Sequence, residues 1–385
     1  MKKIAFSGTL DPITNGHMWV IGEARSMADE VIVFLSENPS KKPQFSVERR
    51  QRVIEQSAAE RGWDNVKVIL VKGDFTARAA KRHGIDYIIR GIRNTSDFDY
   101  ENLIQQTNVD VLHGTKTIFV MPPRDLGSVS SSFVRALQGP VGWHWIVKKF
   151  VPPAAYNAWL HDWLRTEWET LWCYAQADPA AIANADHWFD MLTGPTSYDA
   201  PDRHYHNLDH LVHGLTEIRG WSLNTDNPKG DADLLRKAFW FHDAVYGQDN
   251  GAVSNEEASA RLWLGSGLAN GPDSPDDAAD LIRATAHVQE STITHRLRDV
   301  ICGIDLAILG QDDDVYAAYA AAIRVEYAHM PDAAYNEHRC HALQQWCAQA
   351  EANLLYPDAY FAEHYNQKAQ SNMEWEIAAL SADQS

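Results

Sequence analysis

The feature that most constrains the fold is a regular alternation of short apolar runs and amphipathic stretches over roughly the first 150 residues. Amphipathic segments such as residues 46–61 and 97–112 separate the runs and have the spacing of helices. Such alternation predicts an α/β fold in which a parallel, Rossmann-like sheet carries helices on both faces. Ligands of these sheets bind outside the carboxyl ends of the strands. The runs expected to form strands are residues 3–7, 30–35, 66–71, 86–90 and 116–121.

The pattern changes after Pro152-Pro153. From Ala154 onward the chain is poor in strands and helical in period. Tryptophans recur there at spacings of four or five, a stripe that we expect to pack in a core. We therefore expect two domains, an α/β domain over residues 1–155 and an all-α domain over residues 156–385. The tryptophans of the stripe are Trp159, Trp163, Trp168 and Trp172.

Composition restricts the partners of the chain. A length of 385 residues is enough for two separate cores. The formal charge of −18 argues against a broad nucleic-acid-binding surface, so anionic ligands need local basic pockets. No apolar run approaches the ~20 residues that a membrane span needs, and Met1-Lys2-Lys3 reads as the start of a strand. The four cysteines are scattered without C-x-x-C spacing, as expected for reduced thiols in a cytoplasmic protein.

The stretch from Gly8 to His17 follows the first apolar run and has the composition of a phosphate site. A strand that ends in glycine and turn residues and then opens a helix presents free backbone N–H groups to an anion. Gly8 and Gly16 allow backbone to approach a ligand, and Pro12 stiffens the loop. His17, in the first helical turn, can donate a hydrogen bond to a phosphate oxygen.

Cations and hydroxyls follow the later strands. Lys41 and Lys42 come after the second strand, Gly73 to Thr76 after the third, and Arg90 to Arg93 end the fourth. Ser130, Ser131 and Ser132 follow the fifth and can cap a helix. If a phosphomonoester attacks the α-phosphorus of a nucleoside triphosphate, two anions must be brought together and pyrophosphate must leave. Positioning and positive charge then supply the catalysis.

These residues, taken in order, resemble bacterial phosphopantetheine adenylyltransferase over roughly residues 1–158. The resemblance rests on Gly8-Thr9, Asp11 to His17, Pro39 to Pro43, Arg90 to Arg93 with Asp97 to Glu101, Met121-Pro122 and Val129 to Arg135. It implies adenylyl transfer from ATP to 4′-phosphopantetheine with Mg2+, giving dephospho-coenzyme A and pyrophosphate in coenzyme A synthesis. It also implies a homo-oligomer, a hexamer.

Matching positions imply a role for each site residue. His17 would stabilise the transition state. Phosphopantetheine would be held by Thr9, Lys41, Thr76 and Arg90. ATP would be held by Thr9, Leu10, His17, Gly91, Ile92, Arg93, Glu101, Ser128, Val129, Ser130, Ser131, Ser132, Phe133 and Val134.

The chain departs from the family pattern at a few places. Phe6-Ser7 stand where Tyr-Pro is usual, Leu10 where Phe is usual, and Thr76 where the family is usually apolar. A different adenylyltransferase of the T-x-G-H type, such as one acting on nicotinamide mononucleotide, is the alternative for this domain. Such enzymes lack the pattern from Arg90 to Glu101.

The helical region holds a second group of chemistry-bearing residues. His206, His210 and His213 are spaced so that all three can share one helical face. Further along, His242-Asp243 lies in an apolar segment and Asp305 in another. Burying such groups without a partner or a metal is costly, and imidazole with carboxylate suits a divalent ion that activates water.

This arrangement resembles the HD superfamily of metal-dependent phosphohydrolases. The resemblance implies His210, His242, Asp243 and Asp305 as ligands of a divalent metal, and His206 as a general acid. One ion is the expected number, although His287 could join the set. The metal is left open among Mn2+, Mg2+, Fe2+ and Zn2+, and the substrate among phosphate esters and anhydrides. The alternative is a module that binds metal or nucleotide without turnover, as a regulatory or assembly element.

Overall fold

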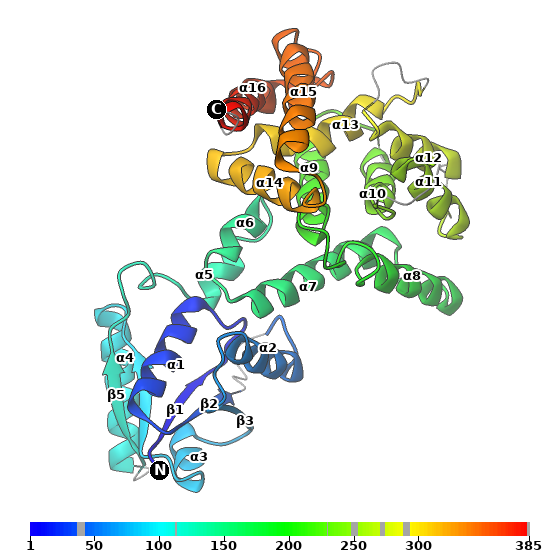
Figure 1. Cartoon of the computed structure of the whole chain (residues 1–385). Coiled ribbons are helices and arrows are strands. Elements are labelled where there is room, and N and C mark those ends of the chain that lie inside the picture. The colour runs from blue at the N-terminus through cyan, green and yellow to red at the C-terminus, as the bar shows by residue number, and fades with distance from the viewer. Residues whose placement is uncertain are drawn as a thin grey trace. The chain divides into compact units, whose positions relative to one another are not determined.

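The computed structural model describes residues 1–36, 43–111, 114–228, 230–247, 253–269, 274–287 and 293–382. The chain divides into two compact units. Unit 1 comprises Met1–Gly139 and Trp143–Trp159, and unit 2 comprises Pro140–Gly142 and Leu160–Ser385. All described strands belong to unit 1, whereas the regular elements described in unit 2 are helices (Figure 1).

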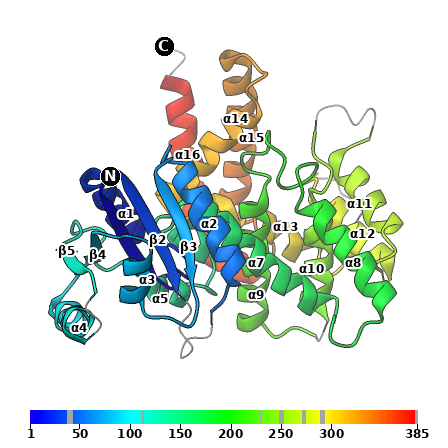
Figure 2. The ribbon, with the colours of Figure 1, turned by 90° about the horizontal axis from the view of Figure 1, so that it is seen from below.

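Unit 1 is built on a five-stranded parallel sheet with the order β3-β2-β1-β4-β5. The strands β1, β2 and β3 lie next to one another in Figure 2. Because the chain moves outward from β1 in one direction and then from β4 in the other, the order reverses between these two strands, which is where such sheets bind ligands. The strands are β1 (Lys3–Gly8), β2 (Glu30–Ser36), β3 (Val66–Val71), β4 (Tyr87–Gly91) and β5 (Lys116–Val120).

The central strands are buried on both faces, as expected for a parallel sheet covered by helices. In β1 the successive residues Ile4, Ala5 and Phe6 are all buried. One core cluster joins β1 to a helix on one face of the sheet through Ala79 and Ala80. The helices of unit 1 are α1 (Asn15–Met27), α2 (Val47–Ala59), α3 (Thr76–Arg82), α4 (Thr95–Gln106), the π-helix η1 (Thr107–Val111), α5 (Ser131–Ala136) and α6 (Trp143–Lys148).

Helix α7 (Pro153–Leu171) begins in unit 1 and continues into unit 2. Its tryptophans are core residues, since Trp159 and Trp168 are fully buried and Trp163 nearly so. The remaining elements are α8 (Pro179–Leu192), α9 (Leu208–Asn224), α10 (Asp231–Phe241), α11 (Asn255–Gly265), α12 (Pro275–Ala284), α13 (Arg298–Leu306), the 3-10 helix η2 (Ala307–Gly310), α14 (Asp313–Glu326), α15 (Asp332–Glu351) and α16 (Ala359–Ala382).

The sequence predictions for the fold are largely confirmed. Each expected strand begins and ends within one residue of an observed strand, and the sheet is parallel as expected. The helical texture after Ala154 is also confirmed. The expected boundary at residue 155 falls inside α7, because an uninterrupted helix spans the change. Among the described residues, no helix is long and apolar enough to cross a membrane, and all four cysteines are free.

Candidate active sites

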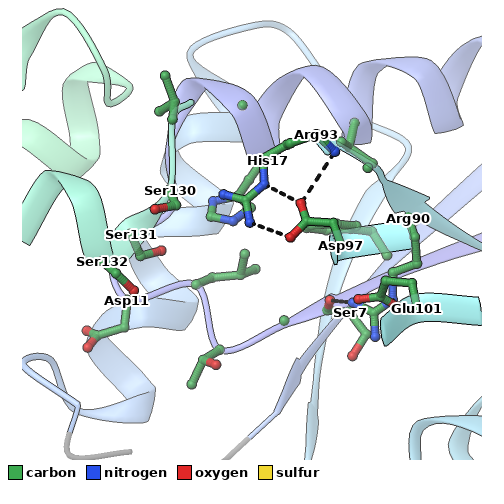
Figure 3. Close-up of a pocket in the computed structure, with 18 of the residues that line it drawn as sticks. Ser7, Asp11, His17, Arg90, Arg93, Asp97, Glu101, Ser130, Ser131 and Ser132 are labelled. Carbon is green, nitrogen blue, oxygen red and sulfur yellow. Dashed lines mark hydrogen bonds and ion pairs between the residues drawn. The ribbon is translucent and has the colours of Figure 1, made fainter. Parts of the chain in front are cut away.

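A cavity of about 480 Å³ lies at the carboxyl ends of the strands in unit 1. The loop after β1 and the end of β4 form its centre, so the cavity sits at the reversal of strand order. Figure 3 shows His17 between three serines on one side and Arg90 with Glu101 on the other. The predicted site residues that line the cavity are Thr9, Leu10, His17, Thr76, Arg90, Gly91, Arg93, Glu101, Val129, Ser130, Ser131 and Ser132.

His17 is fixed by the start of α1. Thr14 is the N-cap, and its backbone N–H donates to Nδ1 of His17 at 3.0 Å. Because Nδ1 accepts this bond, a neutral ring carries its proton on Nε2. Burial, together with the charge of Arg93, lowers the pKa of His17 to about 4. His17 is therefore a neutral hydrogen-bond donor at physiological pH.

Arg93 lies between β4 and α4 and is held by the carboxylate of Asp97 in the first turn of α4. Its Nε donates to Asp97 Oδ2 at 2.7 Å and its Nη2 to Oδ1 at 3.1 Å, the two-pronged geometry that guanidinium also uses for phosphate (Figure 3). The hydrogen bonds from Arg93 lower the pKa of Asp97. The side chain of Asp97 thus covers the face of Arg93 that an anionic ligand would use.

Arg90 is held in a comparable way. Its Nε lies 3.2 Å from Glu101 Oε2, and its Nη1 donates to the carbonyl of Ser7 at the end of β1. The hydroxyl of Ser7 is 3.3 Å from that of Thr76. Two of the positions at which this chain departs from the resembling family, Ser7 and Thr76, are therefore hydrogen-bonded to each other beside Arg90.

The sequence did not single out Asp11 as a site residue, although it lines the cavity. Asp11 is buried, and its carboxylate accepts from the backbone N–H groups of Gln44 at 2.8 Å and Phe45 at 3.0 Å. Arg135 donates to the Asp11 carbonyl from α5. These hydrogen bonds join the loop after β1 to the segment of Gln44 and Phe45 and to α5. They thereby fix the conformation of the loop that leads to His17. The other lining residues not predicted include Ser7, Asp97, Tyr100 and Arg135.

Some predicted ATP-binding residues do not line the cavity. Ile92 and Val134 are buried, and the ring of Phe133 packs edge-on against Phe150 at 5.3 Å. Ser128 is also outside the lining, although Ser130 caps α5 as expected, accepting from the N–H of Phe133. Lys41 lies outside the described residues.

In unit 2 the four predicted metal ligands converge. His210 lies in the first turn of α9, His242 and Asp243 follow α10, and Asp305 lies in the last turn of α13. The Nε2 atoms of His210 and His242 are 3.0 Å apart. Asp243 Oδ2 is 3.1 Å and Asp305 Oδ1 3.6 Å from Nε2 of His242. Ligand atoms of His210, His242 and Asp243 all lie within 4.8 Å of one another, close enough for the three residues to share one ion.

Contacts behind the ligands set their orientation. His242 Nδ1 is 2.7 Å from the carbonyl of Phe239, so Nδ1 carries a proton and Nε2 is the ring nitrogen that faces the cluster. The hydroxyl of Tyr198 accepts from the backbone N–H of Asp243 at 3.2 Å. Gly214 on α9 faces the Phe239 ring, where a Cβ would clash, so this glycine permits α9 and α10 to approach.

The charge of the cluster favours a cation. Burial alone would raise the pKa of Asp243 and of Asp305, but the neighbouring histidines hold both well below the usual range. Burial lowers the pKa of His210, which leaves that imidazole neutral and able to ligate. Against the effect of burial, the two carboxylates raise the pKa of His242 to about 10, so a divalent cation would displace the proton on its Nε2. Two ionised carboxylates and two imidazole nitrogens form a donor set suited to a divalent metal. The residues present therefore fit a metal ion.

His206 lies at the edge of the cluster and is held by Glu326 of α14. His206 Nδ1 is 2.7 Å from Glu326 Oε2, and Oε1 of that carboxylate accepts from the backbone N–H groups of residues 204, 205 and 206. The imidazole of His206 stacks on Tyr246, with ring centroids 4.2 Å apart. Burial lowers the pKa of His206, but the hydrogen bond that its Nδ1–H donates to Glu326 and the nearby carboxylates outweigh burial and raise the pKa overall.

The expectation that three histidines share one helical face is wrong. Asn207 caps α9, so His206 precedes the helix. His213 is on the helix but lies beside Glu217, with His213 Nε2 at 3.0 Å from Glu217 Oε1. Only His210 of the three belongs to the ligand cluster, because His206 lies before the cap and His213 pairs with Glu217.

Comparisons with known proteins agree with the geometry of unit 1. Residues 5–137 match the cytidylyltransferase-like family model. A phosphopantetheine adenylyltransferase of Chromobacterium violaceum is 36% identical over 160 residues, which cover 42% of this chain and 96% of that protein. The enzyme of the same name from Actinobacillus succinogenes is 38% identical over 158 residues, 41% of this chain and 94% of that protein. A class III photolyase structure from Agrobacterium tumefaciens aligns over 99% of this chain and 98% of its own at 11% identity, but its TM-score of 0.24 supports no conclusion.

Proposed function

Through its N-terminal part the chain belongs to the phosphopantetheine adenylyltransferase family, and we propose that this part transfers the adenylyl group of ATP to 4′-phosphopantetheine. A phosphate oxygen of the acceptor attacks the α-phosphorus, the bond to the β-phosphate breaks, and dephospho-coenzyme A and pyrophosphate leave. The observation that carries the proposal is one cavity at the strand reversal that gathers His17, Arg90 and Arg93.

In this reaction His17 donates from Nε2 to an oxygen of the transferred group. A neutral donor suits this task, because it stabilises the charge of the transition state without a proton-transfer step. Thr14 keeps the proton on Nε2 through its bond to Nδ1.

When substrates bind, phosphate groups replace the carboxylates as partners of Arg90 and Arg93. Arg93 leaves Asp97, and Arg90 leaves Glu101, when anionic groups of the substrates arrive. The released carboxylates offer hard oxygen ligands in the same cavity, so the residues present fit Mg2+. When bound, Mg2+ supplies neutralisation of charge on the triphosphate.

The identity of the adenylyl acceptor can be tested by measuring pyrophosphate release from ATP with different acceptors. We expect release with 4′-phosphopantetheine and none above background with nicotinamide mononucleotide, the acceptor of the alternative reading. Release with the mononucleotide alone would contradict the proposal.

For unit 2 we propose a metal-dependent phosphohydrolase. Its support is the cluster of His210, His242 and Asp243, with Asp305 Oδ1 at 3.3 Å and 3.6 Å from the two imidazoles and the pKa of both carboxyls held low. These four residues would hold a divalent ion, which activates water and polarises a phosphoryl oxygen when bound.

His206 has the geometry of a proton donor to the leaving oxygen. Glu326 occupies its Nδ1, so the other ring nitrogen, Nε2, is the one that can carry a proton toward a substrate. The raised pKa favours the protonated imidazolium that a general acid requires.

Hydrolysis can be tested on the full chain with Mn2+ or Mg2+ against phosphomonoesters, nucleotides and coenzyme A precursors. We expect phosphate release that Asp243→Ala abolishes. A wild type as inert as Asp243→Ala would favour the alternative of a module that binds metal without turnover.

A further inference from the structure

Asp305 uses its two carboxylate oxygens in different directions. Oδ1 faces the metal cluster, 3.3 Å from Nε2 of His210 and 3.6 Å from Nε2 of His242. Oδ2 faces away from the cluster and lies 2.8 Å from Nε2 of His287. From the sequence, His287 was predicted only as a possible additional metal ligand.

His287 reaches Asp305 from a turn that ends α12. Its backbone has φ of 52°, in the left-handed region that residues with a Cβ rarely adopt. This conformation costs on the order of 1 kcal/mol. Contacts around His287 must therefore stabilise this backbone conformation.

Those contacts tie the turn to the helix that carries Asp305. The thiol of Cys302, one turn before Asp305 on α13, donates to the carbonyl of Ala284 at 3.3 Å. The N–H of His287 also donates to that carbonyl, at 3.3 Å. Ala284 O therefore receives one bond from each side of the pair, which fixes the approach of His287 to Asp305.

The direction of the hydrogen bond follows from the partners. A carboxylate oxygen accepts, and Oδ2 of Asp305 lies 2.8 Å from Nε2 of His287. Nε2 of His287 is therefore the donor. A nitrogen that carries this proton has no lone pair in that direction for a metal.

We propose that His287 is a positioning residue, whose Nε2–H donates to Oδ2 of Asp305 and leaves Oδ1 alone to bind the ion. The inference rests on the metal site proposed for unit 2. Without the bond, the carboxylate can rotate or bind through both oxygens. Outer partners of this kind typically change metal affinity by about 10–100-fold.

The test compares Mn2+ affinity and stoichiometry by titration calorimetry in the full chain, with His287→Ala, His287→Gln and the control His341→Ala. His341 is exposed on α15 and bonds to Gln345. We expect one ion per chain throughout, binding about 10–100-fold weaker in His287→Ala, and affinity within about threefold of wild type in His287→Gln, whose amide N–H replaces the donor. The absorption spectrum of bound Co2+ should change in His287→Ala and be restored in His287→Gln.

Two results would overturn the inference while leaving a metal site in place. One is wild-type affinity and spectrum in His287→Ala. The other is two ions in wild type and one in both His287 variants, which would make His287 a ligand itself. A wild type that binds no Mn2+ would instead remove the metal site, and the inference with it.

Discussion

The two candidate sites differ in how the chain assembles them. In unit 1 the functional groups stand at the ends of parallel strands, so strand order alone brings them to one edge. In unit 2 the groups come from the start of α9, the end of α10 and the end of α13, and helix packing brings them to one point. The sheet therefore places functional groups around an open cavity, whereas the helices bring a compact cluster of ligand atoms together.

The difference also appears in the charges. In unit 1, Arg90 and Arg93 are paired with carboxylates that an anion can replace. In unit 2, Asp243 and Asp305 are ionised beside histidines, an arrangement that a cation can complete. If, as proposed, the site in unit 1 binds anions and the site in unit 2 binds a cation, a substitution in either site should leave the activity of the other unchanged.

The largest effect is expected for removal of a proposed metal ligand. Asp243→Ala should weaken Mn2+ binding by more than about 100-fold, since removing a ligand exceeds the loss of an outer partner. Adenylyl transfer should stay within about twofold of wild type. The matched control is Asp233→Ala, an exposed acid on α10 paired with Arg236. A parallel loss of adenylyl transfer would break the separation of the sites.

His17→Ala should lower kcat of adenylyl transfer by about 100-fold or more, as removal of a transition-state donor does. Mn2+ content of the chain should not change. Steady-state pyrophosphate release and metal analysis of the same preparation measure both. Turnover retained at the wild-type rate would contradict the role of His17.

Glu326→Gln should lower kcat of phosphate release by about tenfold and leave KM unchanged, because the amide keeps the backbone bonds but no longer holds a charged His206. The alkaline side of the pH profile should move to lower pH, because His206 must be protonated to act as a general acid and loss of the carboxylate lowers its pKa. An unaltered profile would show that the pair only supports the fold.

Thr76→Val should have a small effect. It removes the hydroxyl that meets Ser7 but keeps the shape of the side chain. We expect KM for the acceptor to change by no more than about threefold and the free energy of unfolding by about 1 kcal/mol. A tenfold change in KM would make the hydroxyl pair a direct substrate contact.

The last prediction is that the contribution of His17 to kcat/KM does not change with pH between 5.5 and 8. Burial and Arg93 lower the pKa of His17 to about 4, so the ring stays neutral as pH falls from 8 to 5.5 and is protonated only near pH 4. The ratio of kcat/KM for wild type and His17→Gln should therefore be constant from pH 5.5 to 8. A ratio that falls around pH 6.5 would mean that His17 titrates normally.

Much of unit 1 could be predicted because its signals are local. Apolar runs fixed the strands, and a serine before an apolar pair marked the cap of α5. Side-chain pairing could not be predicted: Ser7 meets Thr76 across 69 positions, and nothing near either residue indicates the other. The pairing of Arg93 with Asp97 was open as well, since each is one of several charges in the same stretch.

In unit 2 the ligands came from a resemblance, because no local pattern connects His210 to Asp305. Glu326 lies 120 positions from His206 and could not be linked to it from sequence. The misplacement of His206 was avoidable. Asn207 is a strong cap signal that places the start of the helix after His206.

The continuous helix α7 has a practical consequence for dividing the protein. Trp159 packs edge-on against Phe45 in the α/β unit, and Trp168 packs against Trp240 in the helical unit. A truncation anywhere between these tryptophans removes part of one core or leaves a severed helix end with an uncovered indole. Separate expression of the halves therefore calls for overlapping fragments that each retain the whole of Pro153–Leu171.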